Sequence, residues 1–152
     1  MGIFAKAPPK YVMRWDCKKT GKCFNEYMRP KLDVFQDCFP VGTFTDIDGA
    51  YERNGHLLLL EWKSPGVELP LAQELMLKRA SLVSKINAIV VNGHAKDMSV
   101  EQFYSIVKGK SHRQRAGGLD DLKELIRMWA AWAEKQPWRH GWVLASEQKS
   151  GI

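Results

Sequence analysis

Four side chains that could carry chemistry lie within one short stretch, between Thr43 and Lys63. Asp46 and Asp48 stand near the start of this stretch, and Glu61 and Lys63 stand at its end. Carboxylate oxygens are the ligands that hard cations such as Mg²⁺ favour. An ammonium group beside them can stabilise negative charge on a bound phosphate. This chemistry requires a local fold that brings the four side chains together.

A hairpin is the element that positions them. The Asn-Gly pair at residues 54–55 separates two segments of strand-like composition, and Asn-Gly is a strong signal for a two-residue turn. The turn fixes the register, which places Asp48 directly opposite Glu61 and Asp46 directly opposite Lys63. Side chains alternate along a strand, so we expect all four on one face of the sheet.

Opposed residues have Cβ atoms about 4.5–5.5 Å apart, so Asp48 and Glu61 should repel each other unless a cation lies between them. A divalent metal that keeps water ligands would leave room for a phosphate oxygen and a nucleophilic water. An ordinary solvated hairpin is the alternative. The apolar run at residues 57–60 argues against it, because it predicts a strand buried on both faces.

These residues resemble the motif of the PD-(D/E)xK nuclease superfamily, which has the restriction-endonuclease-like fold. The resemblance rests on Asp48 and on Glu61-Trp62-Lys63 at the end of an apolar strand, with a spacing similar to that of RecB-type exonuclease domains. It implies that Asp48 and Glu61 bind Mg²⁺ or Mn²⁺, with the carbonyl of Trp62 as a third ligand and Lys63 as the catalytic lysine. The proline that often precedes the aspartate is missing, and Asp46 is kept as an auxiliary ligand.

Two further residues take possible roles from this resemblance. RecB-like relatives carry a Q-x-x-x-Y pattern on the helix after the E-x-K strand; here Gln73 matches the glutamine, but Leu77 occupies the tyrosine position. Gln73 is thus either a residue near the metal and the scissile phosphate or an ordinary surface glutamine. Glu26 is a candidate auxiliary acid on a preceding helix, and a solvated glutamate is the alternative.

The expected fold is α/β: a restriction-endonuclease-like three-layer core with a mixed sheet of αβββαβ type and an extra C-terminal helix. An apolar stripe predicts a helix over residues 70–86, and residues 87–92 predict a buried strand parallel to the strand that ends at Lys63. The third strand is not evident. Residues 99–107 begin with a capping signature and predict a short helix or a helix–strand junction. The last helix should start at Asp120 or Asp121 and bury one wide apolar face, formed by Leu122, Leu125, Ile126, Trp129 and Trp132.

Length and composition indicate one globular domain. The chain has 152 residues, of which 45% are hydrophobic and 26% are charged. No apolar run is long enough to span a bilayer, and the N-terminus lacks the apolar core of a signal peptide, so we expect a cytoplasmic protein without a membrane partner. The resemblance extends this to a bacterial cell or a phage-infected host, because compact nucleases of this kind serve phages and mobile elements.

The net charge of +6 favours a polyanionic partner, most simply DNA, although RNA stays open. Residues 1–13 are expected to be an extended basic arm, and residues 108–118 a mobile basic loop. A solvated charge run is the alternative for that loop. The predicted phosphate contacts are basic residues in these regions and the nearby 14–22 segment: Lys18, Lys19, Lys108, Lys110, Arg113 and Arg115.

The leading hypothesis is therefore a metal-dependent nuclease, and homo-oligomers are common among compact nucleases. A second hypothesis is a non-catalytic module on the same fold that only grips nucleic acid or a protein. A third is a zinc-stabilised protein that uses Cys17, Cys23 and Cys38, with His56 as a fourth ligand. Three cysteines without a secretion signal favour reduced thiols over that zinc site.

Overall fold

The computed structural model describes residues 32–42 and 44–137. Internal contacts divide the chain after Phe44 into two compact units, and each is described by itself. In the first unit, residues Leu32–Cys38 form a 3₁₀ helix, η2, in agreement with the helix-like spacing of its apolar residues. The rings of Phe35 and Phe39 meet Phe44 edge to face, with centroids 6.0 Å and 5.0 Å away.

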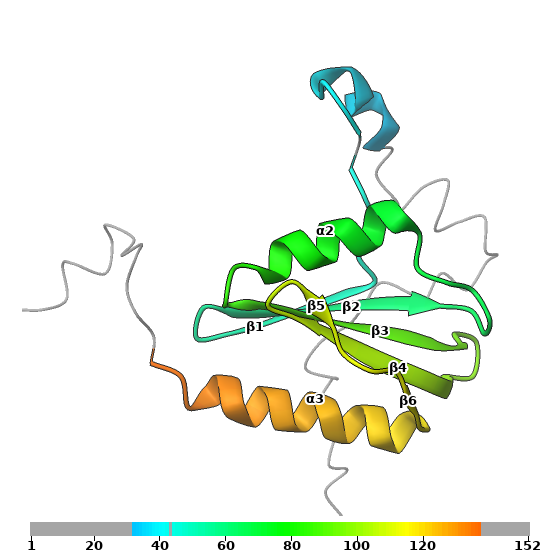
Figure 1. Cartoon of the computed structure of the whole chain (residues 1–152), viewed down its shortest axis with the longest axis vertical. Helices are drawn as coiled ribbons and strands as arrows, with labels where there is room; N and C mark the ends of the chain where they lie inside the picture. The colour runs from blue at the N-terminus through cyan, green and yellow to red at the C-terminus, as the bar shows by residue number, and fades with distance from the viewer. Residues whose placement is uncertain (1–31, 43, 138–152) are drawn as a thin grey trace, which may run out of the picture. The chain divides into compact units, whose positions relative to one another are not determined.

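The second unit is an α/β structure with a mixed, open sheet of six strands and two helices in its described part (Figure 1). The sheet order is β1-β2-β3-β4-β5, and β6 also pairs with β4. The elements follow one another along the chain as β1 (Gly49–Arg53), β2 (His56–Lys63), α2 (Leu71–Ser81), β3 (Ile86–His94), β4 (Ser99–Val107), β5 (Lys110–Ser111), β6 (Arg115–Ala116) and α3 (Leu119–Glu134).

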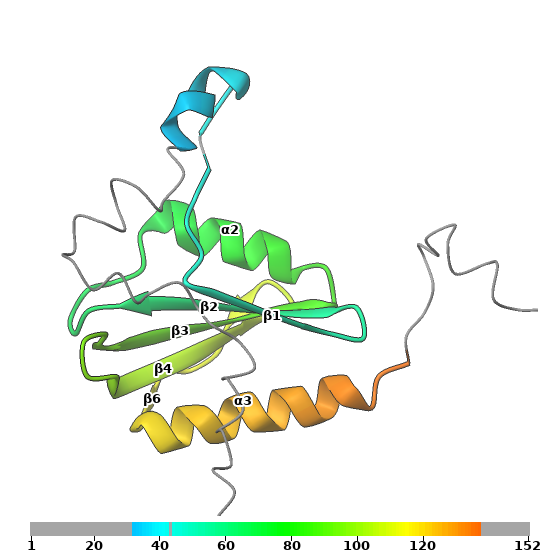
Figure 2. The ribbon, with the colours of Figure 1, turned by 180° about the vertical axis from the view of Figure 1, so that it is seen from behind.

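Strand β2, which lies next to the central strand β3, is covered on both faces. It pairs antiparallel with β1 and parallel with β3, as its buried run at residues 57–60 predicts. Helix α2 covers one face and helix α3 the other, as the two opposite views show (Figures 1 and 2). Leu59 packs with Leu77 on the α2 face, whereas Leu58 packs with Leu122 on the α3 face. Side chains of β2 therefore contribute to the hydrophobic core on each face of the sheet.

The C-terminal helix α3 packs on the sheet as predicted. Four of the five expected apolar residues join the core cluster on that face, namely Leu122, Leu125, Ile126 and Trp129. The fifth, Trp132, is 43% exposed. Its ring lies against His56, with centroids 4.8 Å apart. The last turn of α3 therefore meets the hairpin end of β2.

The helix predicted over residues 70–86 is shorter than expected. It ends at Ser81, and the amides of Leu82 and Val83 close it with bonds to carbonyls three residues earlier. Leu82 and Val83, counted in its predicted apolar stripe, are 69% and 57% exposed. The chain needs these residues to turn, because Ile86 already begins β3.

The prediction of a short helix or a helix–strand junction at residues 99–107 is wrong. This segment is strand β4, antiparallel to β3. The capping signature competes with a period-2 alternation, in which Phe103 faces the α3 core and Tyr104 faces the α2 core. Because its side chains are buried on both faces of the sheet, the segment forms a strand rather than a helix. The described residues hold two strands before α2 rather than the three of an αβββαβ order, and the sheet grows instead through β4 to β6.

Neither α2 nor α3, the α-helices of the described residues, is long and apolar enough to cross a bilayer.

Candidate active site at the end of strand β2

The hairpin turn has the predicted register. Asn54 and Gly55 have φ values of 51° and 76°, and Gly49 pairs with Leu60 as Arg53 pairs with His56. Continuing that register by one residue places Asp48 opposite Glu61. The Asn-Gly dipeptide alone was sufficient to align these two carboxyl residues.

The predicted pairing of Asp46 with Lys63 is not formed, because β1 begins only at Gly49. Asp48 itself ends the ladder: the backbone N–H of Trp62 donates to Asp48 Oδ2 at 2.7 Å. A side-chain oxygen thus satisfies the donor that a further strand residue would have paired. Asp46 lies in the exposed segment before the strand, and its carbonyl accepts a bond from Thr45 Oγ1 at 3.5 Å.

Glu61, Lys63 and Gln73 form one cluster on the α2 face. Glu61 is only 6% exposed. Its Oε1 accepts a hydrogen bond from Gln73 Nε2 at 3.0 Å and lies 2.8 Å from Lys63 Nζ. Gln73 reaches the site because α2 begins at Leu71 and presents its first turn to the end of β2. The structure therefore brings three of the four predicted catalytic residues into direct contact.

Asp48 is joined to this cluster through the backbone. Its carboxylate holds the peptide group between Glu61 and Trp62. The indole Nε1 of Trp62 donates to the carbonyl of Gly93 at 2.8 Å, which fixes Trp62 against β3 on the opposite face. The two carboxyl residues are thus neighbours across the strand pair, and each is held by hydrogen bonds.

The site offers amide and carbonyl oxygens, in addition to its carboxylates, as ligands for a metal ion. Residues 32–42 and 44–137 contain no group of three or more His, Cys, Asp and Glu side chains arranged to hold a metal. A cation at Asp48 and Glu61 would therefore need amide or carbonyl oxygens as well. Gln73 Oε1 is such an oxygen, since it is buried and has no hydrogen-bond partner within the described chain. A buried acceptor without a hydrogen-bond partner is costly. The position of Gln73 next to Glu61 therefore favours binding of a cation, or of a hydrogen-bond donor from a ligand, at this oxygen.

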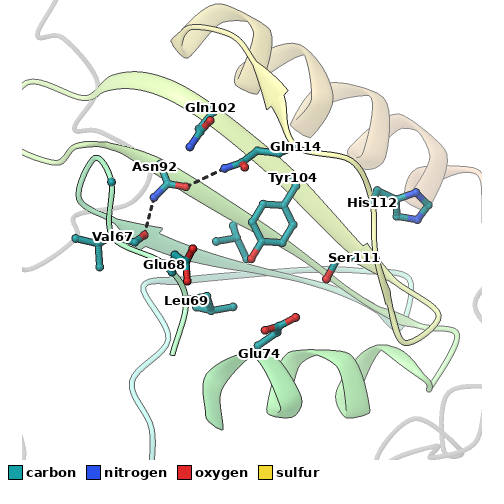
Figure 3. Close-up of a pocket in the computed structure, with 12 residues that line it drawn as sticks. Val67, Glu68, Leu69, Glu74, Asn92, Gln102, Tyr104, Ser111, His112 and Gln114 are labelled. Atoms are coloured by element: carbon teal, nitrogen blue, oxygen red, sulfur yellow. Dashed lines mark hydrogen bonds between the residues drawn. The ribbon is translucent and has the colours of Figure 1, made fainter. Parts of the chain in front are cut away.

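A cavity of about 470 Å³ opens beside the cluster on the same face (Figure 3). Its floor includes Val90 and Asn92, the register partners of Glu61 and Lys63 on the adjacent strand. Five segments contribute to its lining: the loop 66–69, the first turn of α2 with Glu74, β3, β4 with Gln102 and Tyr104, and the β5–β6 return with Ser111, His112 and Gln114.

Buried Asn92 fixes two walls of this cavity. Its Nδ2 donates to the carbonyls of Val67, at 2.9 Å, and Ser64, at 3.3 Å, while its Oδ1 accepts from Gln114 Nε2 at 3.3 Å (Figure 3). The sequence interpretation missed Asn92, Gln102, Tyr104 and Gln114. A period-2 reading of residues 99–107 would have placed Gln102 and Tyr104 on one face.

The carboxylates of Glu68 and Glu74 line the cavity. Burial raises the pKa of Tyr104, and the nearby carboxylates of Glu74 and Glu68 raise it further. Both effects disfavour a tyrosinate. Glu74 is partly neutralised by Lys78 Nζ, 2.5 Å from its Oε1.

The segment predicted as a mobile basic loop, residues 108–118, contains two short strands on β4. Lys110 belongs to β5 and Arg115 to β6. The sequence did not predict this pairing, because only two residues pair in each strand and the segment is rich in glycine, serine and basic residues. The side chains of Lys108, Lys110, Arg113 and Arg115 are all exposed.

The lysines of this segment lie away from the candidate site. Gly109 N donates to Ser81 Oγ at 2.9 Å, which docks the β4–β5 turn on the C-terminal end of α2. Gln73 is at the other end of this helix, about 12 Å away along the axis at 1.5 Å per residue. Arg115 pairs with Phe103 and lies level with Trp62 across the sheet. Because Arg115 pairs with Phe103, its side chain shares the α3 face with Phe103 and Trp62, opposite the face of Glu61 and Lys63.

Several predicted features lie outside the described residues. These are the arm 1–13, Lys18, Lys19, Glu26, Cys17 and Cys23. Cys38 is described and is exposed in the first unit.

Comparisons of the chain with protein-family models, curated proteins and solved structures gave no match.

Proposed function

We propose that this chain is a metal-dependent nuclease of the PD-(D/E)xK type that hydrolyses phosphodiester bonds in DNA. The observation that carries the proposal is the cluster at the end of β2. There, nearly buried Glu61 holds Lys63 and Gln73 on one carboxylate oxygen. Burial of a carboxylate and an ammonium is expensive unless the pair is used or well compensated.

The local topology supports the same assignment. The β1–β2 hairpin is followed by α2 and by β3, which runs parallel to β2. This hairpin, crossover helix and parallel strand resemble the central part of the restriction-endonuclease-like fold. Glu61 and Lys63 lie at the carboxyl end of β2, where ligands of open α/β sheets commonly bind.

The donor set fits Mg²⁺ or Mn²⁺. Asp48, Glu61 and the carbonyl of Trp62 would hold the ion, with the unpaired Oε1 of Gln73 beside them. All of these are oxygen donors, as hard cations prefer. A bound ion would supply Lewis-acid polarisation of the phosphate and would lower the pKa of a water.

The chain's own groups would perform the remaining tasks. The side chain of Lys63 is about one-fifth exposed, so its ammonium can contact a phosphate oxygen while the protein shields much of the side chain from bulk water. Glu61 orients Lys63, and the Nε2 of Gln73 in turn holds Glu61. The hydrogen bond from Trp62 N keeps the Asp48 carboxylate at the same level of the sheet. Of the basic residues predicted to contact phosphate, Arg113 would hold the nucleic-acid backbone, because Arg115 lies on the α3 face.

A non-catalytic nucleic-acid-binding or protein-interaction module on the same fold is the second candidate. One observation favours it: Lys63 already satisfies Glu61, and the backbone of Trp62 already satisfies one oxygen of Asp48. The same contacts would serve a purely structural ion pair. The affinity for a divalent metal separates the two functions, because only the nuclease should lose it in Asp48→Ala.

The test is cleavage of labelled single-stranded, duplex and branched DNA, with an RNA of matched sequence, in Mg²⁺, Mn²⁺ or EDTA. Wild type is compared with Lys63→Ala and with Lys123→Ala, which removes an equal charge from an exposed pair on α3. We expect metal-dependent cutting by wild type and Lys123→Ala, and none by Lys63→Ala. Intact binding without cutting by wild type on every substrate would replace the nuclease with the binding module.

A further inference from the structure

The cavity beside the candidate site has a lining that disfavours phosphate as its ligand. It carries the carboxylates Glu68 and Glu74, and its described lining contains no lysine or arginine. Glu74 has Lys78 as its ion partner, whereas Glu68 is exposed and has no ion partner among the described residues. A phosphate would meet an uncompensated carboxylate there. The cavity therefore suits an uncharged polar group.

Two side chains offer unused hydrogen-bonding groups to that space. Within residues 44–137, neither the amide of half-buried Gln102 nor the hydroxyl of Tyr104 has a hydrogen-bond partner. The amides of Asn92 and Gln114 bind each other and form a fixed wall instead (Figure 3). A cavity in the roughly 300–1,000 Å³ range with a few convergent polar groups has the usual form of a small-molecule site.

We propose that this cavity binds a nucleobase that carries an exocyclic amino group. The amide of Gln102 can donate to and accept from a base edge, and Glu68 can accept from the amino group. The ring of Tyr104 offers a stacking surface and its hydroxyl offers a hydrogen bond to the ligand, and Val90 and Leu69 provide apolar contacts. Cytosine, adenine and guanine meet this requirement, whereas thymine and uracil do not.

Its place in the sheet links the cavity to the candidate site. Val90 and Asn92 are the β3 partners of Glu61 and Lys63, one strand spacing of about 4.8 Å away. A nucleotide whose phosphate lies at Lys63 would thus direct its base into the cavity. This step rests on the proposed function; the base-binding capacity of the cavity does not. The base could belong to a nucleic-acid strand or to a free nucleotide.

The experiment is an NMR titration of the isotopically labelled full chain in EDTA, so that neither a metal nor cleavage is needed. The probes are cytidine, adenosine, guanosine, thymidine, ribose 5-phosphate and a short single-stranded oligonucleotide. We expect saturable shifts at Gln102, Tyr104 and Gln114, with a Kd of about 1 mM or tighter for the amino-bearing nucleosides. Gln102→Ala and Tyr104→Phe should each weaken binding about tenfold, through loss of one hydrogen bond. Lys123→Ala, on α3 and outside the cavity lining, should bind like wild type.

Tighter binding of the oligonucleotide than of the nucleosides, at the same residues, identifies a strand as the source of the base, and the reverse order identifies a free nucleotide. Absence of saturable shifts, or equal shifts with ribose 5-phosphate, would overturn the proposal, and thymidine binding as tightly as cytidine would remove its amino-group requirement. Tyr104→Phe keeps the test informative if Gln102→Ala does not fold. If base binding holds while the DNA panel gives no cutting, the catalytic proposal fails and the base site stands.

Discussion

Lys63 Nζ lies 2.8 Å from Glu61 Oε1, and the two side chains are only 18% and 8% exposed. They stand two residues apart on one face of β2, so the strand itself sets their separation. At this pair the predicted chemistry and the stability of the sheet depend on the same atoms.

Replacement of Lys63 by alanine should therefore lower stability as well as activity. The change leaves Glu61 in a nearly buried position without its cation, although Gln73 still donates to it. We expect the free energy of unfolding to fall by about 2–3 kcal/mol, as for other buried charges that lose a partner. Urea unfolding measures it. The double variant Glu61→Gln with Lys63→Met should lose less than Lys63→Ala, and an equal or larger loss would argue that packing dominates.

A divalent metal should reverse part of that loss. If Glu61 is a metal ligand, Mn²⁺ replaces the missing cation and stabilises the folded state by mass action. We expect Mn²⁺ to raise the Tm of Lys63→Ala by more than that of wild type. The increase should disappear when Glu61→Gln is added. The same small increase in all three proteins would show that the metal does not bind at Glu61.

Asn54 joins the hairpin turn to the end of α3. Its φ is 51°, and its Nδ2 donates to the carbonyls of Ala133 and Glu134 at 3.1 Å each. Asn54→Ala loses both the tolerance for positive φ and the cap on the helix end, so we expect a loss of about 2 kcal/mol in urea unfolding. Asn54→Gly keeps the backbone conformation and should recover about half. If Asn54→Gly were as stable as wild type, the whole loss of stability in Asn54→Ala would come from the backbone conformation.

The ion pair between Arg53 and Glu134 gives this junction a pH dependence. Arg53 Nη2 donates to Glu134 Oε1 at 2.6 Å, and hydrogen bonding to Arg53 lowers the pKa of Glu134. A carboxyl group whose pKa is lower in the folded state stabilises the fold above its ordinary pKa, and the effect is lost as the pH falls through the lowered value. Wild type should therefore exceed Arg53→Gln in stability at neutral pH, and the difference should vanish in acid.

Unfolding measured from neutral to acidic pH checks this sign. Both side chains of the pair are about half exposed, so added salt should shrink the difference at neutral pH. A difference that persisted unchanged in acid or in high salt would assign the effect of Arg53 to packing of its stem rather than to charge.

Local signals in the sequence were sufficient to predict the hairpin and the buried face of α3. The Asn-Gly turn dictates two positive φ values, and these set the register that brings Asp48 level with Glu61. For strand β4, the capping signature at its start favours a helix, whereas the period-2 alternation of its residues favours a strand. Both signals are local, so the sequence alone does not decide between them. Only the sheet environment, with β3 on one side, decides between them.

The cavity could not be predicted in the same way. Glu68, Tyr104 and Gln114 lie on separate segments, and they meet because β3 and β4 pair in one particular register. No turn in the sequence specifies that register, which shifts between Asn92 and Gly93. Charge was also a poor guide here, since the basic 108–118 segment gives the cavity Ser111, His112 and Gln114 rather than its lysines and arginines.

Gly93 is the position where that register can be tested. A Cβ added there would lie 2.2 Å from the carbonyl oxygen of Ser99 and 3.0 Å from Cζ2 of Trp62. Backbone cannot yield as a flexible side chain does, so Gly93→Ala should cost about 3 kcal/mol. Trp62 follows Glu61 directly, so displacement of its ring should also reduce any metal-dependent cutting at temperatures where the variant stays folded.

Gly49→Ala is the matched control on the neighbouring hairpin, because its added Cβ would meet only the side chain of Leu60, at ordinary distances of 3.4 Å to Cβ and 3.8 Å to Cδ2. We expect it to change stability by about 0.5 kcal/mol or less in either direction. Thermal and urea unfolding of the two variants side by side give the comparison. If Gly93→Ala were tolerated as well as Gly49→Ala, then β3 and β4 would not approach each other as described. The register shift that follows the Asn92–Gln102 pair would then fall with that approach.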